Sequence, residues 1–120
     1  MDSRDKGSVG ESYAVTFLEK KGYKIIARNW SSKLGEVDII ASEKDTLVFV
    51  EVKSRHSAEY GIAAQAVDAR KQKQVIKSAL GYIKRQGIVD RDIRFDVVSI
   101  TGGEVELIRN AFQSDGRYRY

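Results

Sequence analysis

The alternation of apolar and polar positions is clearest between residues 35 and 53, which read GEVDIIASEKDTLVFVEVK. Two apolar runs rich in β-branched residues, Val37–Ala41 and Leu47–Val52, predict two strands. The polar segment Ser42–Asp45 between them has the length of a hairpin loop. The pattern therefore predicts an antiparallel hairpin near the middle of the chain.

A helical pattern precedes the hairpin, from about Ser8 to Lys21, and Gly22 follows it as a stop signal. Between this helix and the hairpin, Tyr23–Trp30 predicts a first strand. The apolar residues expected on one stripe of the helix are Val9, Tyr13, Ala14, Phe17 and Leu18. The residues expected on one face of the strand are Tyr23, Ile25 and Ala27.

A second helix is predicted from Ala66 or Asp68 to Arg85, and Gly87 closes it. The segments Ile93–Ile100 and Glu104–Ile108 predict two more strands, separated by a glycine turn. The order is thus helix, three strands, helix and two strands, which indicates one α/β domain over residues 1–120. Residues 1–7 and 113–120 are polar and are expected to form flexible tails.

Acidic residues interrupt the two hairpin strands where apolar residues are expected. Alternation puts Glu51 and Lys53 on one face of the second strand, and Glu36, Asp38 and Ile40 on one face of the first. If the acidic faces pair, Asp38 lies close to Glu51. Two adjacent carboxylates repel each other unless a cation joins them, and Mg²⁺ binds such oxygen ligands. Asp38 followed by Glu51-Val52-Lys53 is the PD-(D/E)xK nuclease pattern.

Glu11 is next in line to the buried side of the first helix, beside Ala14 and Leu18. It can point along the core toward the same site. The alternative is a solvated glutamate in the first turn, where a negative charge favours the helix dipole.

The chain carries a net charge of +4, and its pI is near 9.3. The second helix holds six basic residues and no acid between Arg70 and Arg85, which favours phosphate binding but also fits a solvated face. Cysteine is absent and histidine is single, which excludes thiolate and histidine-rich metal sites. No apolar run is long enough for a membrane span, so we expect a cytoplasmic protein without a membrane partner.

Motifs along nearly the whole chain resemble the YraN-type uncharacterised proteins of bacteria. The motifs are Gly10-Glu11, Arg28-Asn29-Trp30, Gly35–Ile40, Val48–Arg55, Ala66-Val67 with Lys71, and Arg94–Val98. This family is similar to archaeal Holliday junction resolvases. The resemblance implies a restriction-endonuclease-like fold, with a central mixed sheet of about five strands flanked by helices. It also implies that Glu11, Asp38, Glu51 and Lys53 match the resolvase catalytic set.

The leading hypothesis is a Mg²⁺- or Mn²⁺-dependent DNA endonuclease that acts on branched DNA such as Holliday junctions. Asp38, Glu51 and the Val52 carbonyl would hold the metal, Lys53 would stabilise the developing charge, and Glu11 would hold a water or a second metal ion. A two-fold-symmetric junction would call for a homodimer. The residues expected to contact nucleic acid are Arg55, Gln65, Arg70, Lys71, Lys73 and Lys77.

Two other hypotheses remain open at this point. The first is a nucleic-acid-binding module of the same fold that does not cleave. The second is a structural protein in which Asp38 and Lys53 form an ordinary ion pair.

Overall fold

The structure is a computed structural model that describes residues 3–55 and 67–113; the side chains of residues 3–8 and Arg55 are not included in this description. Five strands form one sheet in the order of the chain, and all neighbours are antiparallel except β3 and β4, which are parallel. The elements are α1 (Ser3–Lys20), β1 (Lys24–Ser32), β2 (Gly35–Glu43), β3 (Thr46–Arg55), α2 (Ala69–Gln86), β4 (Ile93–Thr101) and β5 (Glu104–Phe112). The predicted order and the mixed α/β sheet of the restriction-endonuclease-like fold are confirmed.

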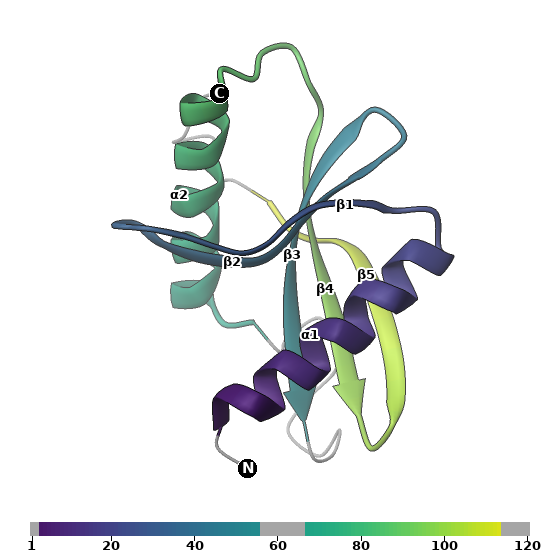
Figure 1. Cartoon of the computed structure of the whole chain (residues 1–120). Helices are drawn as coiled ribbons and strands as arrows, with labels where there is room; N and C mark the ends of the chain where they lie inside the picture. Colours follow the sequence, from purple (N-terminus) through teal and green to yellow (C-terminus); the bar gives the residue numbers. More distant parts are fainter. Residues whose placement is uncertain (1–2, 56–66, 114–120) are drawn as a thin grey trace.

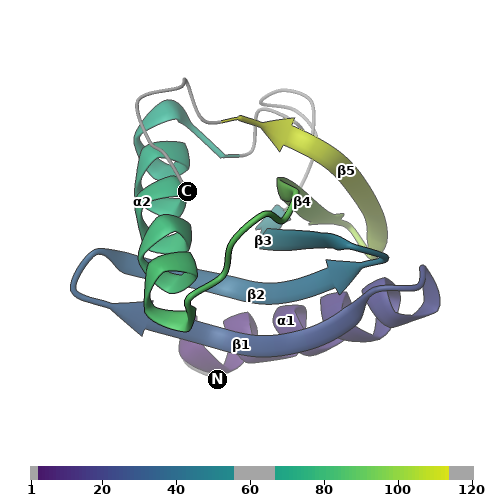
Figure 2. The same cartoon turned by 90° about the horizontal axis from the view of Figure 1, so that it is seen from above.

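The two helices cover opposite faces of the sheet, which twists strongly from β1 to β5 (Figures 1 and 2). Helix α1 packs across β1, β2 and β3, whereas α2 packs mainly on β2. The first turn of α2, the first half of α1 and the carboxyl end of β3 lie toward the same end of the molecule (Figure 1). This arrangement brings residues from three separate segments to one place.

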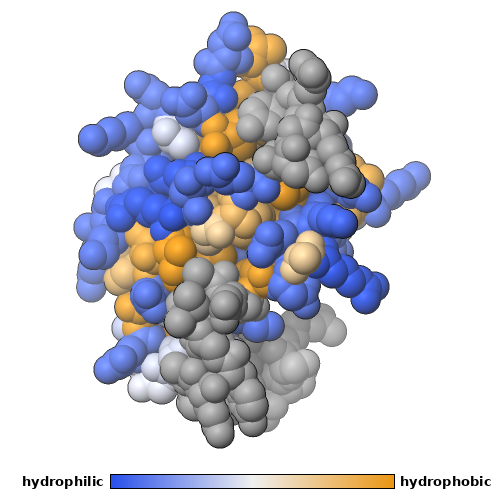
Figure 3. All heavy atoms as spheres, turned by 180° about the vertical axis from the view of Figure 1, so that it is seen from behind, coloured by the Kyte–Doolittle hydropathy of each residue, from blue (hydrophilic) through white to orange (hydrophobic). Residues whose placement is uncertain are grey.

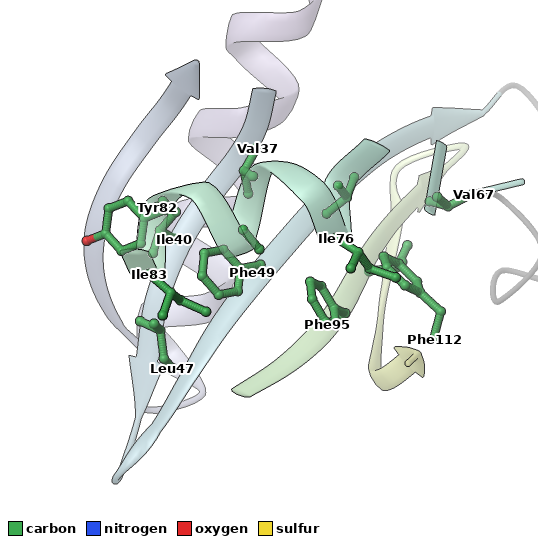
Figure 4. Close-up of a cluster of buried hydrophobic side chains, with 13 residues drawn as sticks. Val37, Ile40, Leu47, Phe49, Val67, Ile76, Tyr82, Ile83, Phe95 and Phe112 are labelled. Carbon is green, nitrogen blue, oxygen red and sulfur yellow. The ribbon is translucent and has the colours of Figure 1, made fainter. Parts of the chain in front are cut away.

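Each face of the sheet has its own apolar core. On the α2 side, aromatic rings form a row in which Tyr82 meets Phe49 edge-on and Phe49 stacks on Phe95 (Figure 4). Trp30 extends this row at one end and Phe112 at the other. On the α1 side, smaller residues such as Val48, Val50 and Val98 pack beneath Leu18. Successive residues of β3 and of β4 thus alternate between the two cores, as in regular strands.

The face predicted for β1 is wrong beyond Ile25. Ile25 pairs with Ala41 and Ala27 pairs with Ile40, so Ile26 is an extra residue in β1. Such a bulge moves every later side chain to the opposite face. Ile25 accordingly packs on the α1 side with Tyr23, whereas Ala27 packs on the α2 side.

Strict alternation also fails in β2. Val37 and Ile40 are three residues apart, yet both pack in the α2-side core. Glu36, Asp38 and Ile40 therefore do not share one regular face. The irregularity lies where the pairing of β2 with β3 ends, at Ile39 opposite Val50.

The buried stripe of α1 differs from the predicted one. Ala14 and Leu18 are fully buried, but Val9 and Tyr13 are more than half exposed. The helix also begins at Ser3, five residues earlier than predicted, so residues 3–7 belong to it; residues 114–120 lie outside the described range. The side of α1 that faces the sheet is the one that carries Glu11, Ala14 and Leu18.

Hydrophilic side chains cover much of the face seen from behind, with an apolar band across its middle (Figure 3). Besides Val9 and Tyr13, the large apolar residues that are well exposed include Leu34, at the tip of the β1–β2 hairpin, and Val89. Within the described ranges, neither helix is long and apolar enough to cross a membrane.

A fully buried acid, Asp96, anchors the end of the sheet at which β4 begins. Its carboxylate accepts hydrogen bonds from the Tyr23 hydroxyl (2.6 Å), the Arg94 guanidinium (2.9 Å) and the Asn110 backbone N–H (2.9 Å). Arg94 also donates to Glu43 at 2.7 Å. Asp96 thus pairs with Arg94, and both of its oxygens accept hydrogen bonds.

The ends of α2 are fixed by its own sequence. Asp68 caps the first turn by accepting from the Lys71 N–H at 2.9 Å, and Gly87 ends the helix in the left-handed conformation. Gly35, at the start of β2, approaches the middle of this helix. A Cβ on Gly35 would lie 2.7 Å from Gln74 Cγ and 3.0 Å from Ser78 Oγ, and its φ is +133°. Only glycine fits this contact without strain.

Gly35→Ala should therefore lower the free energy of unfolding by roughly 2–3 kcal/mol, since it adds backbone strain to a steric overlap. Gly102→Ala is the matched control: its φ is +56° but nothing lies within 4 Å of the added Cβ. We expect it to cost about 1 kcal/mol. Urea unfolding followed by circular dichroism measures both, and equal losses would contradict a tight contact between Gly35 and α2.

Candidate metal and nucleic-acid site

Two carboxylates take over the hydrogen bonding where β2 and β3 separate. Beyond the pair Ile39–Val50, the backbone N–H of Asp38 donates to Glu51 Oε1 at 3.4 Å. In return, the backbone N–H of Val52 donates to Asp38 Oδ2 at 2.9 Å. Each acid thus binds the strand that carries the other one. The expectation that Asp38 lies close to Glu51 is confirmed.

The two carboxylates are poorly neutralised. Glu51 is 4% exposed and Asp38 is half-buried. Within the described ranges, the ion pair that reaches them is formed by Lys71 Nζ, 3.9 Å from Glu51 Oε2. Among the described residues, one buried and one half-buried carboxyl group therefore share one distant ammonium group. Buried carboxylates are costly unless they are paired or bind a metal, so this arrangement favours an additional cation.

Burial also changes the proton affinity of both acids. Desolvation, followed by the charge of Asp38, raises the pKa of Glu51 to about 8, while Lys71 opposes the rise. Desolvation likewise raises the pKa of Asp38, and the hydrogen bond from the Val52 N–H opposes it. A cation that binds here must displace a proton from Glu51 at neutral pH.

Glu11 lies on α1 at the edge of this site. Desolvation and the nearby charge of Asp38 raise its pKa, whereas hydrogen bonding by Asn29 and the charge of Arg28 lower it. The side chain is half-buried and faces the sheet, in line with Ala14 and Leu18. The alternative of a fully solvated first-turn glutamate is wrong. No three acidic or histidine side chains of the described residues, however, come close enough to form a metal-binding group by themselves.

Lys53 is exposed and lies on β3 two residues beyond Glu51, opposite Ser99 of β4. The described ion pairs do not include one between Asp38 and Lys53. This removes the basis of the structural hypothesis, which required that pair. Among the described residues, the ammonium group of Lys53 takes part in no ion pair.

The donor set fits a hard divalent cation. Asp38 and Glu51 supply carboxylate oxygens from two strands, and the Val52 carbonyl is on the backbone segment that Asp38 holds. Mg²⁺ commonly binds through one or two carboxylates and completes its shell with waters and phosphate oxygens. Two protein carboxylates without a third are therefore sufficient for such an ion.

The residues predicted to contact nucleic acid fall into two groups. Lys71 is half-buried at Glu51, whereas Arg70, Lys73 and Lys77 are exposed along α2. These three line a groove of about 430 Å³ with Leu34 and Gln74. Gln65 and the side chain of Arg55 lie outside the described part of the chain.

Two residues near the site were not recognised from the sequence. Asn29, expected to end a strand, lies inside β1 with a φ of +52° and interacts with Glu11. Ser99 is 2% exposed, and its hydroxyl has no hydrogen-bond partner among the described residues. The signal for Ser99 in the sequence was a polar residue in an otherwise apolar strand. Its position beside Lys53 could not be predicted, because it depends on the register of β3 with β4.

The raised pKa of Glu51 predicts a pH-dependent stability. The folded protein binds this proton more tightly than the unfolded chain, in which the pKa is near 4.5. Between about pH 4.5 and 8 the folded state holds more protons, so the free energy of unfolding should fall as the pH rises. Urea unfolding in EDTA at several pH values measures the slope. Glu51→Gln should flatten it, and Asp45→Asn, at an exposed turn, should not.

Addition of Mg²⁺ at pH 8 should restore part of the lost stability in the wild-type protein, since a ligand of the folded state stabilises it. The same addition should have little effect on Glu51→Gln. A wild-type stability that is constant from pH 5 to 8 would contradict the buried, proton-binding state of Glu51.

Comparison with known proteins identifies the family. The model of the uncharacterised protein family UPF0102 matches residues 10–100. A UPF0102 protein of Geobacter metallireducens is 45% identical over 117 residues, which cover 94% of this chain and 96% of the relative. One from Persephonella marina is 41% identical over 110 residues, covering 92% and 95%. The family resemblance inferred from the motifs is confirmed: the chain belongs to the UPF0102 family.

Proposed function

We propose that the protein is a Mg²⁺- or Mn²⁺-dependent endonuclease that hydrolyses phosphodiester bonds in DNA. The observation that carries the proposal is the pair Asp38–Glu51, one half-buried and one buried carboxyl group with a single long ion pair among the described residues, and Lys53 two residues beyond Glu51 on the same strand. The resemblance of the motifs to those of Holliday junction resolvases supports the same reading.

Each residue of the proposed site has a role that follows from its position. Asp38 and Glu51 hold the cation, and the Val52 segment is fixed beside it by the hydrogen bond to Asp38. When bound, the cation would polarise the phosphate and lower the pKa of water. Lys53, which is exposed, would stabilise the negative charge that develops on the phosphate oxygens. Glu11 orients a water from the α1 side.

Branched DNA is the proposed substrate within this class. A junction with two-fold symmetry requires two cuts, so the proposal includes a homodimer with two equivalent sites. The basic side of α2 supplies the phosphate contacts that any DNA substrate needs.

A DNA-binding protein without cleavage is the second candidate. Lys71 already forms an ion pair with Glu51, although at 3.9 Å it is a long one. If this ammonium group replaces the cation permanently, the fold and the basic helix would bind DNA but the acids would not catalyse. The two candidates differ in whether Mg²⁺ binds.

Asp38→Asn should abolish most of the activity, because it keeps the size of the side chain but removes a metal-binding charge. Several kcal/mol of lost charge stabilisation corresponds to a fall of about 100-fold or more in cleavage rate. Lys53→Met should cause a comparable loss while it leaves Mg²⁺ binding intact. The assay uses labelled duplex, flap, fork and four-way DNA with Mg²⁺ or Mn²⁺, and calorimetry measures the metal affinity.

Matched controls come from the exposed β2–β3 turn: Asp45→Asn and Lys44→Met make the same chemical changes away from the site. Both should cleave like the wild type. Absence of cleavage with every substrate and metal, together with absence of Mg²⁺ binding, would reject the nuclease and leave the binding module.

A further inference from the structure

The groove between the β1–β2 hairpin tip and α2 is separate from the acidic pair. It is lined by Leu34 of the hairpin and by Arg70, Lys73, Gln74 and Lys77 of the helix. Three cations and an amide thus surround one apolar side chain. This composition suits a ligand that is anionic on one side and apolar on the other.

The three cations are available to a ligand. Each is exposed, and none takes part in an ion pair among the described residues. Helix α2 contains no acidic residue that could neutralise them locally. A charged row of this kind attracts a polyanion, and a single small anion would contact only part of it.

The shape of the groove depends on a close contact between hairpin and helix. Gly35 lies against Gln74 and Ser78, and a Cβ on Gly81 would come within 3.1 Å of Leu34 Cδ1. The tip of the hairpin lies beside α2 in both ribbon views (Figures 1 and 2). Leu34 is therefore held at the groove, although it is 52% exposed.

The spacing of the cations matches a nucleic-acid strand. From Arg70 to Lys77 the helix advances seven residues, or about 10 Å at 1.5 Å per residue. One strand of DNA advances about 3.4 Å per phosphate, so this length corresponds to about three nucleotides. Lys71, next to Arg70 in the chain, lies 3.9 Å from Glu51, so the Arg70 end of the row is the end nearer the acidic pair.

We infer that this groove seats a stretch of about three nucleotides of a DNA strand, to one side of the reacting phosphate. Arg70, Lys73 and Lys77 bind phosphates within this stretch, and Leu34 packs against a sugar or base between them. The groove would then set the distance between the cut and the bound backbone. The inference rests on the proposed function for the identity of the partner, but its binding step needs no metal.

The test is the affinity of the full chain for a fluorescein-labelled DNA duplex in EDTA, measured by anisotropy over a range of salt concentrations. Lys73→Ala combined with Lys77→Ala should make the slope of log affinity against log salt concentration shallower by about 1.8, because two phosphate contacts are lost. At 0.1 M salt this amounts to roughly 10- to 60-fold weaker binding. Leu34→Ser should weaken binding without changing the salt slope, since it removes no charge.

The control is Lys84→Ala combined with Arg85→Ala, which removes the same charge from the last turn of α2, outside the groove. It should bind almost like the wild type. All substituted side chains are exposed, and thermal melts check that each variant remains folded.

Equal losses in the two double variants would overturn the inference, because binding would then follow net charge alone. Wild-type affinity of Leu34→Ser would also overturn it. Groove-dependent binding in a protein that never cleaves DNA would reject the nuclease but not the groove. If the variant that lacks Lys73 and Lys77 cleaves DNA and binds it with wild-type affinity, the groove would be rejected but the nuclease would not.

Discussion

The structure depends on the exchange of hydrogen bonds at the point where β2 leaves β3. A strand that separates from its neighbour exposes backbone N–H groups, and buried donors need partners. Asp38 and Glu51 supply those partners across the gap, each to the opposite strand. The same carboxylates that complete the sheet are therefore drawn together in a buried position. The same two side chains therefore satisfy the backbone N–H groups of the separating strands and place two carboxylates side by side. Moving either acid along its strand would lose both.

Asp96 shows what a purely structural acid looks like in this fold. It is fully buried, yet it accepts four hydrogen bonds, two of them from the guanidinium of Arg94 at 2.9 Å. Glu51 is almost as deeply buried, but the ion pair that it forms among the described residues is a long one, to Lys71. Burial alone does not mark a functional acid, because both residues share it. The deficit of positive charge is what distinguishes the pair at the β2–β3 separation from the network at the other end of the sheet.

The sequence was sufficient to predict the elements, their order and the proximity of Asp38 to Glu51, because each depends on local periodicity or on a short hairpin. It was insufficient where one extra residue changes the register. Ile26 forms a bulge, and no local signal separates it from Ile25. The stripe of α1 was also misassigned, since Val9 and Tyr13 fit the same helical periodicity as the buried Leu18 and only the sheet decides which side is covered. Ser99 lies beside Lys53 through the parallel pairing of β3 with β4, a contact between segments far apart in the chain.

Helix α2 connects the two parts of the proposed site. Asp68 fixes its first turn, which places Lys71 at Glu51, and Gly35 holds the hairpin against its middle. The same β2 strand that begins at Gly35 carries Asp38 three residues later. The groove and the acidic pair are thus joined through one helix and one short piece of strand, without an intervening loop in the described chain. A ligand that contacted both would therefore meet a spacing that the packing of α2 against β2 sets.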